Sequence, residues 1–352
     1  MKCTIRFSIF ILLLIVTVSS LSGKSPRVQA KTNSFRFVAW GDTKSGLSAL
    51  AALSKQIAPL KPKFTLYSGD LEDFGFTISG TEAWKKAVNG DITGTTNNNM
   101  FDKTFPVRGN HDNGNTAGWP RYHDISTKAK AAGGTNYIAL TPDLTYSFDY
   151  GNSHFVGIDV PGDITFITSN QTIWLDSDLT TAENRGLAHA FIFFHGPIYA
   201  VDGHCCPTAP KSFINVINNH PIVTATFHGH EHVSAFVQMN NARYSGLTHT
   251  FQEFVVGNAG APLYQCASGR SDWCYDQNNG FAAVDVSDSG YTINFYAEGN
   301  TSPIKTLTFN KYGSVSPANV PPARSKPIIQ LWSMISTRII IFRDWLEERL
   351  GL

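Results

Sequence analysis

The chain has 352 residues, of which 42% are apolar, 16% charged and 12% aromatic. This profile excludes a disordered, collagen-like or coiled-coil protein and supplies ample apolar residues for a large core. Lysine and arginine number 28 against 27 aspartates and glutamates. Because there is no excess of positive charge, we expect no nucleic-acid polymer as a partner.

The N-terminal segment has the pattern of a secretory signal peptide. Lys2 and Arg6 precede the apolar run 9–18, and Val28-Gln29-Ala30 fits a small-x-small cleavage site. The run is shorter than the ~20 residues that span a bilayer, which argues against a membrane anchor. We predict that residues 1–30 are removed and that the protein is exported to the periplasm or the extracellular space.

From residue 35 onwards the sequence predicts strands alternating with helices, the pattern of an α/β domain. Helices are expected at 48–57 and 82–88, and the Gly/Thr/Asn-rich stretch 89–99 is expected to be a loop. Apolar β-rich runs predict strands at 35–40, 64–67, 105–107, 146–150, 154–160, 190–194, 222–227, 251–256, 281–286, 291–296 and 306–309.

Polar side chains follow five of these strands: Asp42, Asp70, Asn110, His195 and His230. In open α/β sheets, ligands bind beyond the carboxyl ends of the strands, so we expect these side chains to meet. Carboxylate, amide and imidazole groups are ligands of Zn, Fe, Mn or Mg. With His232 they make six candidate ligands, and a carboxylate among them can bridge two metal ions.

In chain order, the motifs are Gly41-Asp42-Thr43-Lys44, Gly69-Asp70-Leu71-Glu72-Asp73, Gly109-Asn110-His111-Asp112, His195 and Gly229-His230-Glu231-His232. Together they resemble the signature of the calcineurin-like metallophosphoesterase superfamily, with purple-acid-phosphatase-like features, over roughly residues 35–310. The resemblance implies a four-layer α/β/β/α sandwich of two mixed β-sheets flanked by helices, and a catalytic domain at residues 31–312.

The resemblance also implies a role for each motif residue. Asp42, Asp70 and His232 would hold a first metal ion, with Asp70 bridging to a second. The remaining ligands of that second ion would be Asn110, His195 and His230. His111 would contact the phosphate and protonate or stabilise the leaving oxygen, and Asp73 would orient His111. The two ions would be Fe, Mn or Zn, because donor types alone do not select one metal.

Lys44 departs from the family pattern, because many members have a metal-ligating histidine there. A charged ammonium has no lone pair and cannot ligate a metal. Lys44 would therefore contact substrate phosphate or be a solvated neighbour of a first site with fewer ligands. His204 has the spacing of a substrate-facing histidine of purple acid phosphatases, or is a loop histidine. Arg108 is a candidate for phosphate binding, with a salt bridge as the alternative.

Four cysteines follow the predicted signal peptide: Cys205, Cys206, Cys266 and Cys274. In an exported chain they predict two disulfides. One arrangement pairs Cys266 with Cys274 in a local loop and leaves Cys205–Cys206 as a vicinal pair. The alternative pairs the two regions with each other.

The C-terminal residues 313–352 are predicted to form a proline-rich linker and an amphipathic helix. The helix would pack on its own domain, lie on a membrane surface as a peripheral contact, or mediate an oligomer contact. The sequence does not distinguish among these three interpretations.

These observations predict an exported metal-dependent phosphoesterase whose substrate is a small phosphate ester. The resemblance implies attack by a metal-bridging hydroxide, with His111 as acid or phosphate stabiliser. A phosphomonoesterase is favoured because of His204. The alternatives are a phosphodiesterase acting on nucleotides or lipid head groups, and a non-catalytic protein that binds metal or phosphate on the same fold. Lys44 is the observation that supports the non-catalytic alternative.

Overall fold

The computed structural model describes residues 34–75, 77–113, 118–204 and 208–311. The predicted signal peptide, Cys205 and Cys206, and the predicted C-terminal linker and helix lie outside the described residues. Within the described ranges, no helix has both the length and the apolar character needed to cross a membrane.

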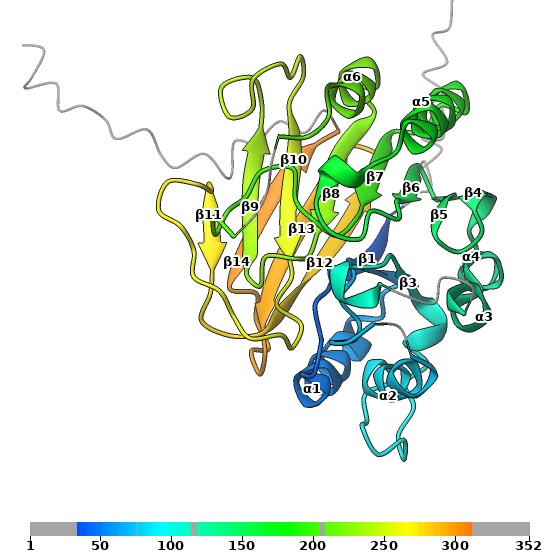
Figure 1. Cartoon of the computed structure of the whole chain (residues 1–352), viewed down its shortest axis with the longest axis vertical. Coiled ribbons are helices and arrows are strands. Elements are labelled where there is room, and N and C mark those ends of the chain that lie inside the picture. The colour runs from blue at the N-terminus through cyan, green and yellow to red at the C-terminus, as the bar shows by residue number, and fades with distance from the viewer. Residues whose placement is uncertain (1–33, 76, 114–117, 205–207, 312–352) are drawn as a thin grey trace, which may run out of the picture. The chain divides into compact units, whose positions relative to one another are not determined.

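Two mixed β-sheets form the centre of the domain (Figure 1). The first sheet has the strand order β14-β13-β12-β1-β2-β3. Its strands are β1 (Phe35–Trp40), β2 (Phe64–Tyr67), β3 (Thr104–Pro106), β12 (Gly280–Ser287), β13 (Gly290–Ala297) and β14 (Lys305–Asn310). The second sheet has the order β11-β9-β10-β8-β7-β6-β5-β4. Its strands are β4 (Thr135–Thr141), β5 (Thr145–Tyr150), β6 (Ser153–Gly157), β7 (His189–Phe193), β8 (Val223–His228), β9 (Ser234–Met239), β10 (Phe251–Val256) and β11 (Trp273–Tyr275).

Helices cover the outer faces of both sheets (Figure 1). The α-helices are α1 (Leu47–Ile57), α2 (Ile78–Val88), α3 (Trp119–His123), α4 (Ile125–Ala132), α5 (Ser169–Asn184) and α6 (Lys211–Asn219). Short 3₁₀ turns are η1 (Ala58–Leu60), η2 (Phe101–Lys103), η3 (Asn110–Asp112) and η4 (Ile164–Phe166). Apolar residues of α1 and α2 join a buried cluster with the first sheet, and those of α5 and α6 join one with the second.

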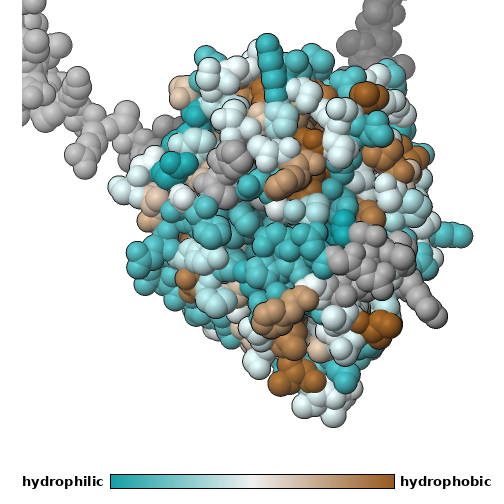
Figure 2. Space-filling view, viewed as in Figure 1, coloured by the Kyte–Doolittle hydropathy of each residue, from teal (hydrophilic) through white to brown (hydrophobic). Residues whose placement is uncertain are grey.

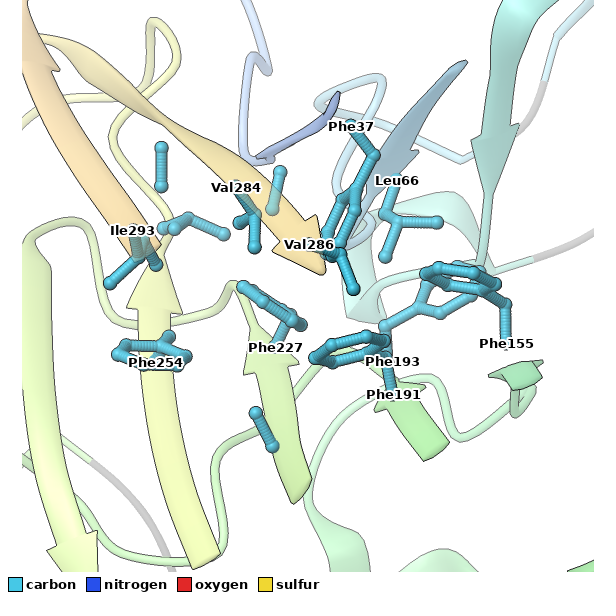
Figure 3. Packing of buried hydrophobic residues seen from close by; sticks show 14 of the residues in the cluster. Phe37, Leu66, Phe155, Phe191, Phe193, Phe227, Phe254, Val284, Val286 and Ile293 are labelled. Atoms are coloured by element: carbon cyan, nitrogen blue, oxygen red, sulfur yellow. The ribbon is translucent and has the colours of Figure 1, made fainter. Parts of the chain in front are cut away.

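The core between the sheets is rich in phenylalanine (Figure 3). On β1, Phe37 faces the second sheet, whereas Val38 belongs to the cluster under α1 and α2, as the two-residue period of a strand requires. The Phe37 ring lies 5.3 Å from that of Phe191 and 5.6 Å from that of Phe227, which come from β7 and β8. These layers confirm the predicted four-layer sandwich of two mixed sheets flanked by helices.

Parallel pairing brings the polar strand ends to one edge. Strand β1 pairs in parallel with β2, and β2 with β3. In the second sheet β7 pairs in parallel with β8. The carboxyl ends of parallel neighbours lie at the same edge, so the turns after these five strands share one end of the sandwich.

Most of the predicted strands are present within a residue or two, but several elements were not predicted. Helix α2 begins at Ile78 rather than residue 82, because Thr77 caps its N-terminus by accepting a hydrogen bond from the Gly80 amide. Helices α3 to α6 and strands β4, β9 and β11 are additions to the sequence prediction. The structure contains the disulfide Cys266–Cys274, which is the predicted local pairing.

A buried histidine joins β6 to its neighbours. His154 Nδ1 lies 2.7 Å from Asp149 on β5, and its Nε2 lies 2.9 Å from Asp178 on α5. Arg185 adds a second cation 2.7 Å from Asp149. Burial alone would lower the pKa of His154, but the two carboxylates outweigh burial and raise this pKa. The contacts of His154 with Asp149 and Asp178 therefore connect α5 to the second sheet.

Candidate metal centre

The turns that carry the predicted ligands have an unusual backbone. Asp42, Asp70 and His230 have φ values of 63°, 54° and 68°. Non-glycine residues rarely adopt this left-handed region, and each such residue costs roughly 1–3 kcal/mol. Three residues of this kind at one end of the sandwich indicate that the surrounding structure fixes the direction of their side chains.

Asp42, Asp70 and His232 form the first ligand group, whose ligand atoms lie within 4.8 Å of one another. The Asp42 Oδ1 atom accepts a hydrogen bond from the His230 amide, and the Asp70 Oδ1 atom accepts one from the His111 amide. The Oδ2 atoms of both carboxylates are buried and have no hydrogen-bond partner. Buried polar atoms are nearly always satisfied, so these two oxygens fit the role of metal ligands.

The histidine of the first ligand group is held in the tautomer that metal binding requires. His232 Nδ1 donates to the Pro262 carbonyl over 2.7 Å, since a carbonyl can only accept. Its Nε2 lone pair is therefore free, and this buried atom has no hydrogen-bond partner. A ligating histidine typically donates its other nitrogen in this way.

Asn110, His195 and His230 form the second ligand group. His195 Nδ1 donates to the Ser68 carbonyl over 2.8 Å, so its Nε2 carries a lone pair. This Nε2 lies 2.9 Å from Asn110 Oδ1, 3.2 Å from His230 Nδ1 and 3.4 Å from Asp70 Oδ1. His195 Nε2, Asn110 Oδ1 and Asp70 Oδ1 are acceptors that lie close together, so this group also fits a metal ion.

The protonation of the two groups agrees with that interpretation. Burial lowers the pKa of His195, and it lowers those of His230 and His232 to about 3 and about 4. The three rings are neutral at pH 7 and keep a lone pair for a metal. Burial and then the Asp70 charge raise the pKa of Asp42 well above its ordinary value. Burial acts in the same direction on Asp70, but nearby His195 and a donated amide hydrogen bond lower its pKa.

Lys44 lies directly beside the first ligand group. Its Nζ is 3.7 Å from Asp70 Oδ2, and its side chain is only 12% exposed. The lysine is therefore not a freely solvated neighbour of the site. Its ammonium competes with a metal ion for the same carboxylate oxygen, and it stands within reach of a phosphate bound there.

His111 is held by backbone groups on both sides of Phe74. Its Nδ1 donates to the Asp73 main-chain carbonyl over 2.7 Å, and its own carbonyl accepts from the Gly75 amide over 2.8 Å. The family resemblance implies that the Asp73 carboxylate orients His111, whereas the contact is made by the main-chain carbonyl of Asp73. The bond leaves His111 Nε2 for a substrate.

His204 lies over the second ligand group at the end of the loop that follows β7. Its ring centroid is 5.4 Å from that of His230 and 4.9 Å from that of Tyr264. Tyr264 in turn stacks on His232, with centroids 4.1 Å apart. Tyr264 was not predicted from the sequence as a neighbour of the site.

Two buried carboxylates hold this loop, and neither was predicted. Glu253 on β10 accepts hydrogen bonds from the amides of Ile198 and Tyr199, at 2.8 and 3.0 Å. Glu231, between two ligands, accepts one from the Val201 amide at 2.6 Å. Burial raises the pKa of Glu253 to about 8 and that of Glu231 to about 9. These contacts position His204 by fixing the backbone that leads to it.

Arg108 has the salt-bridge role rather than a place at the site. Its Nε and Nη2 lie 2.8 and 2.6 Å from the two oxygens of Asp159, a bidentate pair. The arginine is buried. Because its Nε and Nη2 groups donate to Asp159, we do not count Arg108 among the substrate-binding residues.

Asp112, the last residue of the third motif, joins two site loops and was not predicted to do so. Its Oδ1 accepts from the amides of Leu71 and Glu72, at 2.9 and 3.2 Å, and its Oδ2 accepts from Gly109 at 2.8 Å. Close approach also explains Gly229, where a Cβ would lie 2.0 Å from Asp42 Oδ2. Asp112 links two of the ligand-bearing turns by hydrogen bonds, and Gly229 lets a third approach Asp42 closely.

Comparisons with known proteins agree with this geometry. Residues 35–234 match the family model of calcineurin-like phosphoesterases. No curated protein matches the chain. Among solved structures, a purple acid phosphatase from yellow lupin seeds has 16% identity and a TM-score of 0.58, with 82% of this chain and 56% of that chain covered. This chain thus spans little more than half of the lupin protein.

Two further structures share the fold at low identity. GAP50 of Plasmodium, described as the anchor in the inner membrane complex, has 14% identity and a TM-score of 0.55, with 79% and 89% of the two chains covered. PhoD has 11% identity and a TM-score of 0.51, with 79% and 70% covered. Since the family match extends over more than half of the chain, the protein belongs to the calcineurin-like phosphoesterase family.

Proposed function

We propose that this protein is an exported phosphatase that hydrolyses small phosphate monoesters with two metal ions, Fe, Mn or Zn, in the first and second ligand groups. The observation that carries the proposal is the set of buried ligand atoms without hydrogen-bond partners in the first group. The neighbouring acceptor atoms His195 Nε2, Asn110 Oδ1 and Asp70 Oδ1 support the second ion.

When bound, the ions bind phosphate oxygens and supply a hydroxide nucleophile at neutral pH. The chain contributes His111 as the acid. In its protonated form His111 donates the Nε2 proton to the leaving oxygen, while the phosphorus–oxygen bond breaks and its electron pair stays on that oxygen. The Asp73 carbonyl holds Nδ1 and so keeps Nε2 directed to the substrate. The products are inorganic phosphate and an alcohol.

The preference for monoesters rests on Lys44 and His204. A monoester has more unsubstituted, charged oxygens than a diester. The Lys44 ammonium, 3.7 Å from Asp70, and the exposed His204 ring, 5.4 Å from that of His230, are donors on two sides of the ligand groups. A diester would leave one of these donors facing an esterified oxygen.

Three observations bear on the remaining parts of the proposal. The Cys266–Cys274 disulfide supports export, because disulfides persist in oxidising compartments. The fold also occurs in a protein described as an anchor, so the fold alone does not argue for catalysis. Lys44 supports a non-catalytic alternative, because its ammonium competes with a metal ion for Asp70.

The test combines metal analysis of the purified protein with turnover of p-nitrophenyl phosphate and bis-p-nitrophenyl phosphate. We expect about two metal ions per chain and faster turnover of the monoester. His111→Ala should keep the metal and lose roughly 10²–10⁴-fold in turnover, the range of general acid–base catalysis. Asp70→Asn should lose metal and turnover together. His249→Ala, outside both ligand groups, is the control and should change neither.

Other outcomes assign the alternatives. Faster turnover of the diester would identify a phosphodiesterase. One metal ion or none, without turnover after Mn, Zn or Fe is added, would favour the non-catalytic protein.

A further inference from the structure

An apolar hollow opens beside the candidate metal centre, between α1, α2 and the turn that follows β2. Its volume is about 300 Å³. The lining includes Leu47, Leu71, Phe74 and Ala83, and Lys44 stands where the hollow approaches the first ligand group. On the face drawn in Figure 2, apolar residues form separate patches at the borders of a broad hydrophilic band.

Phe74 is the most exposed large apolar side chain of the described chain, at 95%. Single exposed apolar residues are common and need no explanation by themselves. Phe74 differs because the residues before and after it both bond to His111, through the Asp73 carbonyl and the Gly75 amide. The backbone of this fully exposed aromatic residue is therefore fixed beside the acid of the proposed reaction.

That position determines which part of a substrate Phe74 can meet. An acid must lie within about 2.6–3.2 Å of the oxygen that it protonates. The group attached to the leaving oxygen therefore begins next to His111, which bonds to Asp73 and Gly75, two residues that line the hollow. The apolar lining gives this group an apolar environment, while Lys44 remains on the phosphate side.

A second hollow, on the Asn110 side, is a poorer match for an apolar group. Its volume is about 730 Å³, and its lining includes Asn113, Asp159, Gln171 and the 66% exposed Phe166. Polar and apolar atoms contribute about equally to this surface, whereas apolar atoms dominate the hollow beside Phe74. The hydrogen bonds of the His111 backbone go to Asp70 and Gly75, so the Phe166 ring lacks the fixed relation to the acid that Phe74 has.

We infer that the leaving group of the preferred substrate is a planar aromatic group, which enters the apolar hollow and stacks on Phe74. The inference rests on the proposed function and specifies its substrate class. A cavity of about 150 Å³ can hold benzene, so 300 Å³ accommodates one aromatic ring. The phosphorus–oxygen bond breaks, the oxygen takes the His111 proton, and the aromatic alcohol departs through the hollow.

Non-hydrolysable analogues test this inference without turnover. Inhibition constants of phenylphosphonate and methylphosphonate are measured against p-nitrophenyl phosphate hydrolysis, for the wild type and three variants. Phe74→Ala should raise the constant for phenylphosphonate about three- to tenfold, the range of one aromatic contact, and change that for methylphosphonate less than twofold. Phe74→Tyr keeps the ring and should restore wild-type inhibition.

Phe166→Ala is the matched control, because it removes another exposed phenylalanine, from the other hollow. Loss of phenylphosphonate affinity in Phe166→Ala, but not in Phe74→Ala, would overturn the inference and assign the leaving group to the other side. Equal loss for both analogues in Phe74→Ala would also overturn it, because the effect would then not depend on the aromatic ring. Neither result affects the proposed phosphatase activity, which fails only if the wild type hydrolyses no ester.

Substrates then distinguish the two sources of an aromatic group. The ratio of kcat/KM between wild type and Phe74→Ala is measured for phenyl phosphate, adenosine 5′-monophosphate and glycerol 2-phosphate. A large ratio for phenyl phosphate alone indicates an aryl ester. A large ratio for both aromatic substrates indicates a group that includes nucleosides. Ratios that are equal for all three esters would contradict the inference.

Discussion

Asp112 offers the sharpest test of how the two site loops are held together. The residue is 1% exposed, and its carboxylate accepts three backbone hydrogen bonds from Leu71, Glu72 and Gly109. In Asp112→Ala, three buried amides lose their acceptor, and each such loss costs about 1–3 kcal/mol. Allowing for water that enters the space, we expect the free energy of unfolding to fall by about 4 kcal/mol.

Asp112→Asn should cost much less, about 1–2 kcal/mol. The amide oxygen can still accept from Leu71 and Glu72, but its NH₂ group faces the Gly109 amide, so one hydrogen bond is lost. Part of this loss is offset, because the neutral side chain no longer repels the Asp70 charge. That repulsion, after burial, raises the pKa of Asp112 well above its ordinary value.

The assay is urea unfolding in the presence of a chelator, so that metal binding does not contribute to stability. Asp288→Asn, on the exposed turn between β12 and β13, is the control and should stay within about 0.5 kcal/mol of wild type. With metal restored, Asp112→Ala should lose about a hundredfold in turnover, since small displacements of catalytic groups have effects of that size. Equal destabilisation by the alanine and asparagine variants would refute this reasoning about individual hydrogen bonds.

Three further changes test other parts of the structure. Lys44→His should raise metal affinity at least about tenfold in chelator competition, because removing a unit charge ~4 Å away is worth ~1–4 kcal/mol. Lys44→Met also removes the charge but adds no ligand, so its gain in metal affinity should be smaller. Gly229→Ala should abolish metal binding without unfolding the chain, since its Cβ would lie 2.0 Å from Asp42 Oδ2. His154→Gln should destabilise by about 3 kcal/mol at pH 5.5. Because the folded-state pKa of His154 is raised, the stabilisation is complete below the unfolded pKa near 6.5 and is lost as pH rises. A stability difference between wild type and His154→Gln that does not shrink by pH 9 would contradict this reasoning.

The positions of the ligands could be predicted because strand ends are marked in the sequence. Asp42 and Asp70 each follow an apolar, β-rich run and a glycine, and the structure has strands there that end at Trp40 and Tyr67. The parallel order that brings the ends together follows from the alternation of strands and helices. The roles assigned to individual ligands came from the family resemblance, and they remain predictions until metal binding is measured.

Helix α5 shows why other elements were missed. Its sequence is mostly polar, and Ile173 points to solvent at 70% exposure, so the apolar spacing is weak. A signal was nevertheless present, because Thr168 and Gln171 form a capping box at its N-terminus. Strand β9 is buried between β10 and β11. It begins two residues after His232, so its short apolar run was not recognised as a strand separate from the ligand motif.

The residues that hold the site together depend on contacts that no local pattern encodes. Glu253 bonds to Ile198 across 55 residues of sequence, and Asp112 bonds to Leu71 across 41. A single sequence marks such residues only as polar groups in apolar surroundings. Of these, Asp112 was the more accessible to prediction, since it belongs to a motif already recognised.

The structure decides a question about Lys44 that the sequence left open, namely where its ammonium group lies. From the sequence, a phosphate contact and a solvated side chain were equally acceptable. In the fold, a left-handed turn with φ of 49° and a mostly buried stem place the ammonium between Asp70 and the apolar hollow. An ion that takes the Asp70 Oδ2 atom displaces this ammonium from its partner, and the charge is then best neutralised by a phosphate held at the same centre. A residue that weakens metal binding in the free enzyme would thus strengthen substrate binding in the loaded one, so Lys44→Met should raise metal affinity and KM together.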